Sequence, residues 1–103
     1  MNRASGGASL VSRRREEALA EAVRTAIIEA VQRTVKSLLT RLHGDFKDST
    51  INKIRNRIRE DPDPFISNFK VIDEHEDMVM AEVWVTVEVE VDEELLKRTL
   101  LRE

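Results

Sequence analysis

Nine residues near the carboxyl end, 83–91, read VWVTVEVEV and alternate valine with polar or larger side chains. Successive side chains of a β-strand point to opposite faces, so this spacing places every valine of the segment on one face. The predicted valine face covers residues 79–91, while Met78, Met80 and Trp84 fall on the opposite face. Such a strand needs an apolar layer against its valine face, and this requirement constrains the fold more than any other feature.

A long amphipathic helix is the element predicted to cover that valine face. Between residues 12 and 43, apolar residues recur at every fourth position and form one stripe. A row that repeats every four residues turns about 40° per step around a helix, so the stripe drifts along the helix. We therefore expect the helix to cross a twisted sheet obliquely, rather than to break near Thr34, with its carboxyl end committed to another contact. The first row begins with four alanines, which permit close approach of the helix to the sheet: Ala18, Ala22, Ala26 and Ala30.

Two shorter helices and a second strand complete the predicted order of elements. Residues 49–60 have apolar side chains on one side and basic side chains around the other, which is typical of a surface helix. The Asp-Pro-Asp-Pro sequence at 61–64 ends that helix, because proline lacks an amide donor and disfavours a helical residue before it. Residues 65–75 are predicted to form a strand, 74–77 a polar turn, and Asp92 the cap of a terminal helix.

The fold class follows from these elements. We predict a single α+β domain over residues 12–103, in which the long helix packs on an antiparallel sheet that contains a long carboxyl-terminal hairpin, with two short helices beside it. Residues 1–11 contain two glycines beside two serines and no periodicity, which favours a flexible leader or an expression remnant. A two-stranded hairpin is marginal alone, so a strand from this leader or from a second subunit is expected to complete the sheet.

Charge is distributed unevenly along the chain. The net charge is −3, but residues 1–43 carry eight basic and four acidic side chains, whereas residues 61–103 carry four basic and thirteen acidic ones. This polarity favours attraction between a basic helical layer and an acidic sheet within one fold. The alternative is head-to-tail contact between subunits, so self-association as a homodimer or larger assembly is among the expected partnerships.

Few residues of this chain are of the types that carry catalytic chemistry. The chain has no cysteine, and His43 and His75 stand far apart in sequence without a recognisable nucleophile motif. The acidic sequence 73–77 lacks the spaced ligands and sharp glycine of a calcium loop, which favours a solvated turn. No apolar run approaches the roughly 18 residues of a membrane span. We therefore predict no enzymatic activity, no metal, no cofactor and no membrane insertion.

An apolar patch is the first candidate for binding a protein partner. Met78, Met80 and Trp84 are predicted to lie together on one face, either covered by the second helix or open to a partner. Leu38 and Leu42 add candidate partner contacts at the far end of the long helix. Together these residues predict a protein-interaction or assembly module.

Basic side chains of the second helix give an alternative function, which is nucleic-acid binding. Four of them would neutralise phosphates: Lys53, Arg55, Arg57 and Arg59. The acidic carboxyl-terminal half of the chain and its lack of a stacking aromatic pair disfavour this alternative. A purely self-associating structural domain is the third reading of the sequence.

The order of these patterns also resembles that of a known family. An alanine-spaced helix is followed by a variable helical segment, an aromatic entry to a strand, a second strand and a terminal helix with leucine. The residues that carry the pattern are Arg15, Ala18, Ala22, Ala26, Val31, Phe65, Ile66, Phe69, Val71, Val83 to Val91 and Leu95.

Over about residues 13–100 the chain resembles the amino-terminal domain of flagellar assembly protein T and related small outer-membrane lipoprotein domains. It departs from them at Pro64, where a glycine is expected, and at residues 5–11, where a glycine-containing strand is missing or degraded. The resemblance implies a periplasmic or cell-envelope location and a noncatalytic module that helps to assemble a ring or envelope complex.

Overall fold

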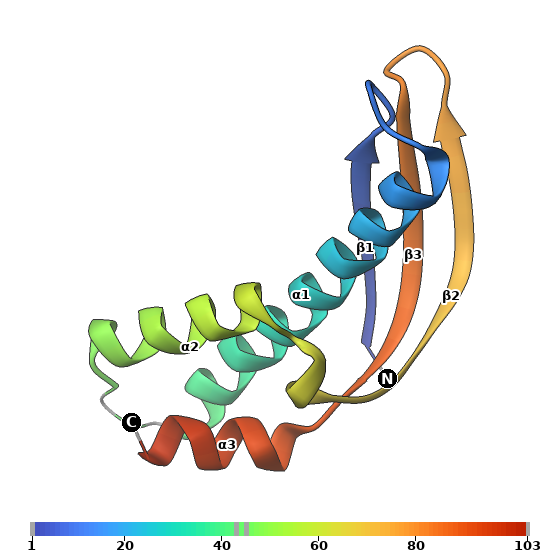
Figure 1. Ribbon diagram of the computed structural model, residues 1–103. Helices are drawn as coiled ribbons and strands as arrows, with labels where there is room; N and C mark the ends of the chain where they lie inside the picture. Colours follow the sequence, from blue (N-terminus) through green and yellow to red (C-terminus); the bar gives the residue numbers. More distant parts are fainter. Residues whose placement is uncertain (1, 43, 45, 103) are drawn as a thin grey trace.

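A computed structural model of the chain describes residues 2–42, 44 and 46–102. The described residues form a three-stranded sheet, three α-helices and one short 3₁₀ helix (Figure 1). In chain order the elements are β1 (Asn2–Ser9), α1 (Arg15–Leu42), α2 (Asp48–Glu60), η1 (Asp63–Phe65), β2 (Ile66–Asp77), β3 (Glu82–Val91) and α3 (Glu93–Arg102).

The sheet is antiparallel, with β3 in the centre and β1 and β2 at its two edges. Helix α1 crosses one face of the sheet obliquely, over β1 and β3 (Figure 1). This arrangement confirms the predicted α+β fold, in which a long amphipathic helix packs on an antiparallel sheet with a long carboxyl-terminal hairpin. Helix α1 is continuous through Thr34, so the stripe drifts around the helix without a break.

The core beneath α1 consists of small side chains on the helix and valines on the central strand. The four predicted alanines are fully buried, and so are the inward valines of β3: Ala18, Ala22, Ala26, Ala30, Val83, Val85, Val87 and Val89. Alanine lets the helix backbone approach the sheet closely, while branched valine fills the space between strands. The predicted valine face, called the valine floor below, is therefore present from Val83 to Val89.

The prediction that residues 1–11 form a flexible leader is wrong for residues 2–9, which form strand β1. Three small residues of β1 face α1 and are buried: Ala4, Gly6 and Ala8. Gly6 lies opposite Val85 of β3, and a Cβ atom added to it would lie 2.4 Å from the carbonyl oxygen of Ala22. The segment lacks large apolar residues because the backbone of α1 leaves no room for them. It supplies the strand that completes the sheet.

The carboxyl-terminal part of α1, which also reaches the start of β1 through Arg33 and Thr34, packs on α2 and α3 (Figure 1). Ile54 and Ile58 of α2 and Leu96 and Leu100 of α3 are buried at this helical end. The drift of the stripe around α1 explains the change of partner, because the second half of the stripe faces away from the strands. Two predicted boundaries are confirmed: α2 ends at Glu60 before the prolines, and Asp92 caps α3, since its Oδ1 accepts a hydrogen bond from Leu95 N at 3.0 Å.

The turn of the β2–β3 hairpin lies four residues later than predicted. Residues 74–77 continue strand β2, and the turn is formed by residues 78–81. Asp77 Oδ1 accepts hydrogen bonds from the amides of Val79 and Met80, at 3.0 and 3.1 Å, and these bonds stabilise the turn. The sequence pattern, by contrast, predicts that the side chains of this acidic segment are solvated. Ala81 then adopts a left-handed backbone with φ of 51°. Val79 is therefore in the turn and not on the valine floor.

Candidate interaction surfaces

Two loops at one end of the sheet carry a group of exposed apolar side chains, which we name the apolar end: Val11, Met78, Val79 and Met80. The loop after β1 contributes Val11, and the β2–β3 turn contributes the other three. Leu10 N donates a hydrogen bond to the carbonyl of Ala81 at 2.8 Å, which holds the two loops side by side (Figure 1). The exposed fractions are 65% for Val11, 82% for Met78, 93% for Val79 and 62% for Met80. These side chains are available to a partner without any rearrangement of the core.

Charged side chains surround the apolar end but do not cover it. Arg15 at the start of α1 pairs with Glu76 of β2 and also lies 3.7 Å from Glu74. The hydrogen bond and the negative charge of Glu76 raise the pKa of Arg15 above its ordinary value, so Arg15 stays charged. Arg13 pairs in the same way with Glu21. The two pairs of Arg15 tie the first turn of α1 to β2 beside the turn that carries the methionines, whereas the Arg13–Glu21 pair joins the loop before α1 to α1 itself.

Trp84 lies on the face of the sheet opposite α1 and is 38% exposed. Its ring lies over Gly7 of β1, and its Nε1 donates a hydrogen bond to Glu82 Oε2 at 3.0 Å. Helix α2 packs at the helical end, so the alternative in which the second helix covers Trp84 is wrong. Because Met78 and Met80 are in the turn, the structure places them apart from the strand face that carries Trp84.

Leu38 and Leu42 differ in their exposure. Leu38 is only 4% exposed and belongs to the core where α1 meets α2 and α3, so its prediction as a partner contact is wrong. Its apolar surface is already used within the chain, because the drift of the stripe turns it toward the helical end. Leu42 is half-buried at the last residue of α1.

The basic side chains predicted on the second helix are exposed, as expected for the outer face of α2: Lys53, Arg55, Arg57 and Arg59. Arg55 also lines a shallow depression of about 320 Å³ with Arg33 and Lys36 of α1. Glu29 and Gln32 complete the lining of this depression. The structure therefore brings basic groups of two helices together, which the sequence did not predict.

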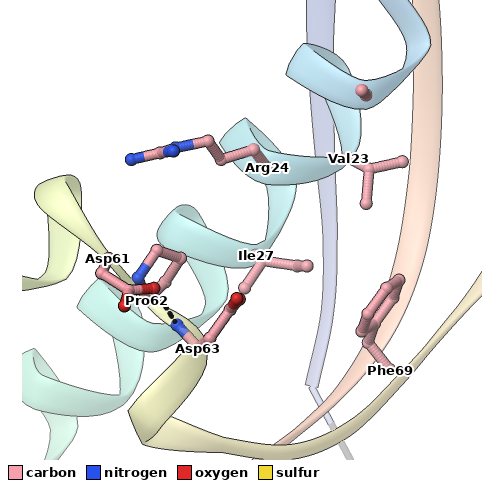
Figure 2. Close-up of a pocket in the computed structure, with 8 residues that line it drawn as sticks. Val23, Arg24, Ile27, Asp61, Pro62, Asp63 and Phe69 are labelled. Carbon is pink, nitrogen blue, oxygen red and sulfur yellow. Dashed lines mark hydrogen bonds between the residues drawn. The ribbon is translucent and has the colours of Figure 1, made fainter. Parts of the chain in front are cut away.

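A pocket of about 300 Å³ lies between α1 and β2 (Figure 2). Val23 and Ile27 of α1 and Phe69 of β2 form its apolar side. At its other side Arg24 Nη2 donates hydrogen bonds to the carbonyls of Arg59 and Glu60, both at 2.7 Å. Arg24 therefore satisfies the free carbonyls at the carboxyl end of α2 and fixes that end against α1. Phe69 is 45% exposed beside this pocket.

The described residues include neither a cluster that could hold a metal ion nor a helix that could cross a membrane. In that part of the chain no group of three or more acidic, histidine or cysteine side chains is placed to hold a metal ion. His75 is exposed on β2, and His43 lies outside the described residues. Of the helices in the described ranges, none has the length and apolar character needed to cross a membrane.

The chain matches no protein-family model and no curated protein in sequence. The candidate surfaces therefore depend on the geometry of this molecule. Sequence reasoning missed Val11 and Val79, although the consecutive apolar residues of Met78-Val79-Met80 after an Asp that can hold a turn were a usable signal.

Proposed function

We propose that this domain is a noncatalytic protein-interaction module that docks to a protein partner through its apolar end. The observation that carries the proposal is the grouping of Val11, Met78, Val79 and Met80, each more than 60% exposed, on two loops joined by a backbone hydrogen bond. Contiguous exposed apolar groups on a soluble domain mark interaction sites, and methionine adapts its shape to a partner surface.

The charges near the apolar end favour a protein over a lipid surface as the partner. Strand β2 approaches the turn with four carboxylates, Asp73, Glu74, Glu76 and Asp77, and Arg15 pairs with two of them. Anionic lipid headgroups attract basic segments and repel acidic ones. As a further part of the proposal, the resemblance to envelope-assembly domains suggests the cell envelope or periplasm as the place of this interaction.

Replacement of Met78 and Met80 together by serine is expected to weaken partner binding at least about tenfold, because each buried methionine contributes about 1.5–3 kcal/mol to an interface. The free energy of unfolding should change by less than about 0.5 kcal/mol, since both side chains are exposed. The measurement is crosslinking in the source cells through a photoreactive residue at position 79, with the mass of each adduct read by mass spectrometry. We expect one discrete protein adduct that the double variant loses.

The control for this experiment is Leu101→Ser, which removes an apolar side chain that is 63% exposed on α3, near the opposite end of the molecule. This variant should keep the adduct of position 79. Adducts made only with lipid, or an equal loss of the adduct in the control and in the double variant, would contradict docking through the apolar end.

Nucleic-acid binding is the second candidate, favoured by the depression in which Arg55 joins Arg33 and Lys36. If this candidate is correct, the affinity for a mixed-sequence duplex falls steeply as salt rises, because bound phosphates release counterions. Lys53→Glu/Arg55→Glu should then reduce the salt dependence, whereas Lys97→Glu on α3 should not. Fluorescence anisotropy at several salt concentrations measures this, and no binding at low salt rejects the candidate.

A further inference from the structure

Strand β2 is a long open edge of the sheet. Helix α1 lies over β1 and β3, and in Figure 1 β2 runs along the outer side of the molecule, with α2 and α3 beyond the end of the sheet at which β2 begins. Of the twelve residues of β2, only Ile66, Ile72 and Asp77 are half-buried, and the others are exposed. An edge of this length presents unpaired backbone groups that can pair with another strand.

The face of β2 on the α1 side carries apolar residues without a cover. Phe69 lies opposite Val89 and Val71 opposite Val87 in the register with β3, so both point to the same face as the valine floor. Their exposed fractions are 45% and 39%, because α1 does not extend over β2. A strand added beside β2 would bury both side chains.

The other edge of the sheet is less available. Arg33 Nη1 of α1 donates a hydrogen bond to the backbone carbonyl of Arg3 in β1 at 2.7 Å. Asn2 at the start of β1 also donates to the hydroxyl of Thr34 at 3.0 Å. At least one backbone carbonyl of β1 is therefore already bonded to a side chain of α1, and the start of β1 is held against that helix.

The charges along β2 decide what can pair with it. Residues 66–71 contain one basic and no acidic side chain, whereas residues 73–77 contain four carboxylates. A parallel copy in register would place each carboxylate beside its equivalent, which is destabilising. An antiparallel copy with Asn68 opposite His75 places every carboxylate opposite the half of β2 that has no acidic side chain.

We infer that β2 pairs antiparallel with β2 of a second copy of this chain, in the register that places Asn68 opposite His75, two residues that share the face away from α1. In this register Lys70 lies opposite Asp73 of the second copy, and the pair occurs twice because the contact is two-fold symmetric. Lys70 and Asp73 lie on the same face, since their partners in β3 are Glu88 and Thr86, both outside the valine floor. A shift by two residues would place Lys70 opposite His75 and lose both ion pairs.

The same register brings apolar residues of the two copies together. Val71 lies opposite Ile72 of the second copy at the two-fold axis, and Phe69, the next residue on the α1 side of each strand, lies opposite Glu74 of the second copy. The irregularity in β2 between Val71 and Asp73 keeps the faces matched, because Phe69 and Glu74 both point toward α1 on opposite sides of it. The second irregularity, between Ile66 and Asn68, limits the matched pairing to residues 68–75. The product is a six-stranded sheet with one α1 on each side of a shared apolar strip.

This dimer is a contact separate from the proposed docking surface, and it determines how the apolar ends of the two copies are oriented. Because the two β2 strands run in opposite directions, the two apolar ends would point away from each other. The twelve residues of β2 separate them by about 40 Å. A dimer of this form would hold two partner molecules at opposite ends.

The test is the molar mass by light scattering after size exclusion, across a concentration series at low salt, for the wild-type chain and three variants. The wild type should be a dimer that dissociates on dilution. Lys70→Asp and Asp73→Lys each create two like-charge pairs and should each raise the dissociation constant at least about tenfold. The double variant Lys70→Asp/Asp73→Lys restores both opposite-charge pairs and should return the constant to within about threefold of the wild type.

The double variant also separates the interface from folding. Lys70→Asp places a carboxylate opposite Glu88 within one chain, and this defect persists in the double variant. Because Lys70 and Asp73 of one chain also share a face, the circular dichroism spectrum of each variant must match the wild type for recovery of the dimer to report a contact between copies. A wild type that is monomeric throughout, or a double variant as weak as the single ones, would overturn the inference. Met78→Ser/Met80→Ser should leave the dimer intact, and loss of the dimer in that variant would place the contact at the apolar end instead.

Discussion

Gly6→Ala is expected to lower the free energy of unfolding by about 3 kcal/mol, because the new methyl group has no space between β1 and α1. An ideal Cβ at this position lies 2.4 Å from the carbonyl oxygen of Ala22 and 2.7 Å from the amide nitrogen of Ala26. Both are backbone atoms of α1, so no side-chain rotation relieves the overlap, and the helix must move away from the sheet. The measurement is urea unfolding followed by circular dichroism.

The adjacent glycine provides the matched control. A Cβ at Gly7 meets the ring of Trp84 at 2.8 Å, and that ring is the exposed part of a side chain that can turn aside. Gly7→Ala should therefore cost less than about 1 kcal/mol, although both substitutions reduce the flexibility of the unfolded chain equally. Equal losses for the two variants would show that α1 does not approach β1 as closely as the structure describes.

This close contact also explains why the first strand was not predicted from the sequence. Strand propensity is strongest for branched and aromatic residues, and β1 contains none. Its residues are small because the alanines of α1 occupy the space above them. This cause is a contact between segments distant in sequence, so the local sequence pattern of β1 does not reveal it. The alternation of Ala4, Gly6 and Ala8 was the remaining signal, since small residues at every second position complement a helix with an alanine row.

The elements with large apolar side chains were predicted correctly, because such side chains show in the sequence itself which face must be buried. The valines of β3 and the four-residue repeat of α1 require burial on one face, and only a helix on a sheet satisfies both. The hairpin turn was misplaced because residues 74–77 look like solvated turn residues by composition, whereas the decisive contact is the Asp77 carboxylate with the amides of Val79 and Met80. The same error hid Val79, the most exposed residue of the apolar end.

Ile54→Ala is expected to lower the free energy of unfolding by about 3 kcal/mol, which is the usual cost of deleting a fully buried branched side chain. Ile54 is 0% exposed and lies in the core at the end where α2 packs on α1 and α3. Ile51→Ala is the control, because Ile51 is on the same helix but only half-buried, and its loss should be about 1 kcal/mol.

The shape of the unfolding curve of Ile54→Ala matters as much as its midpoint. Helix α1 spans 28 residues, about 42 Å, and it packs on the sheet along most of its length while its carboxyl-terminal part also packs on α2 and α3. Because a single helix connects the two parts of the core, loosening the helical end should destabilise the sheet with it. We therefore expect one transition when helix content and Trp84 fluorescence are followed together. Separate transitions would mean that the sheet, with the apolar end and the β2 edge, is stable without the helical end, and that α1 does not couple the two parts.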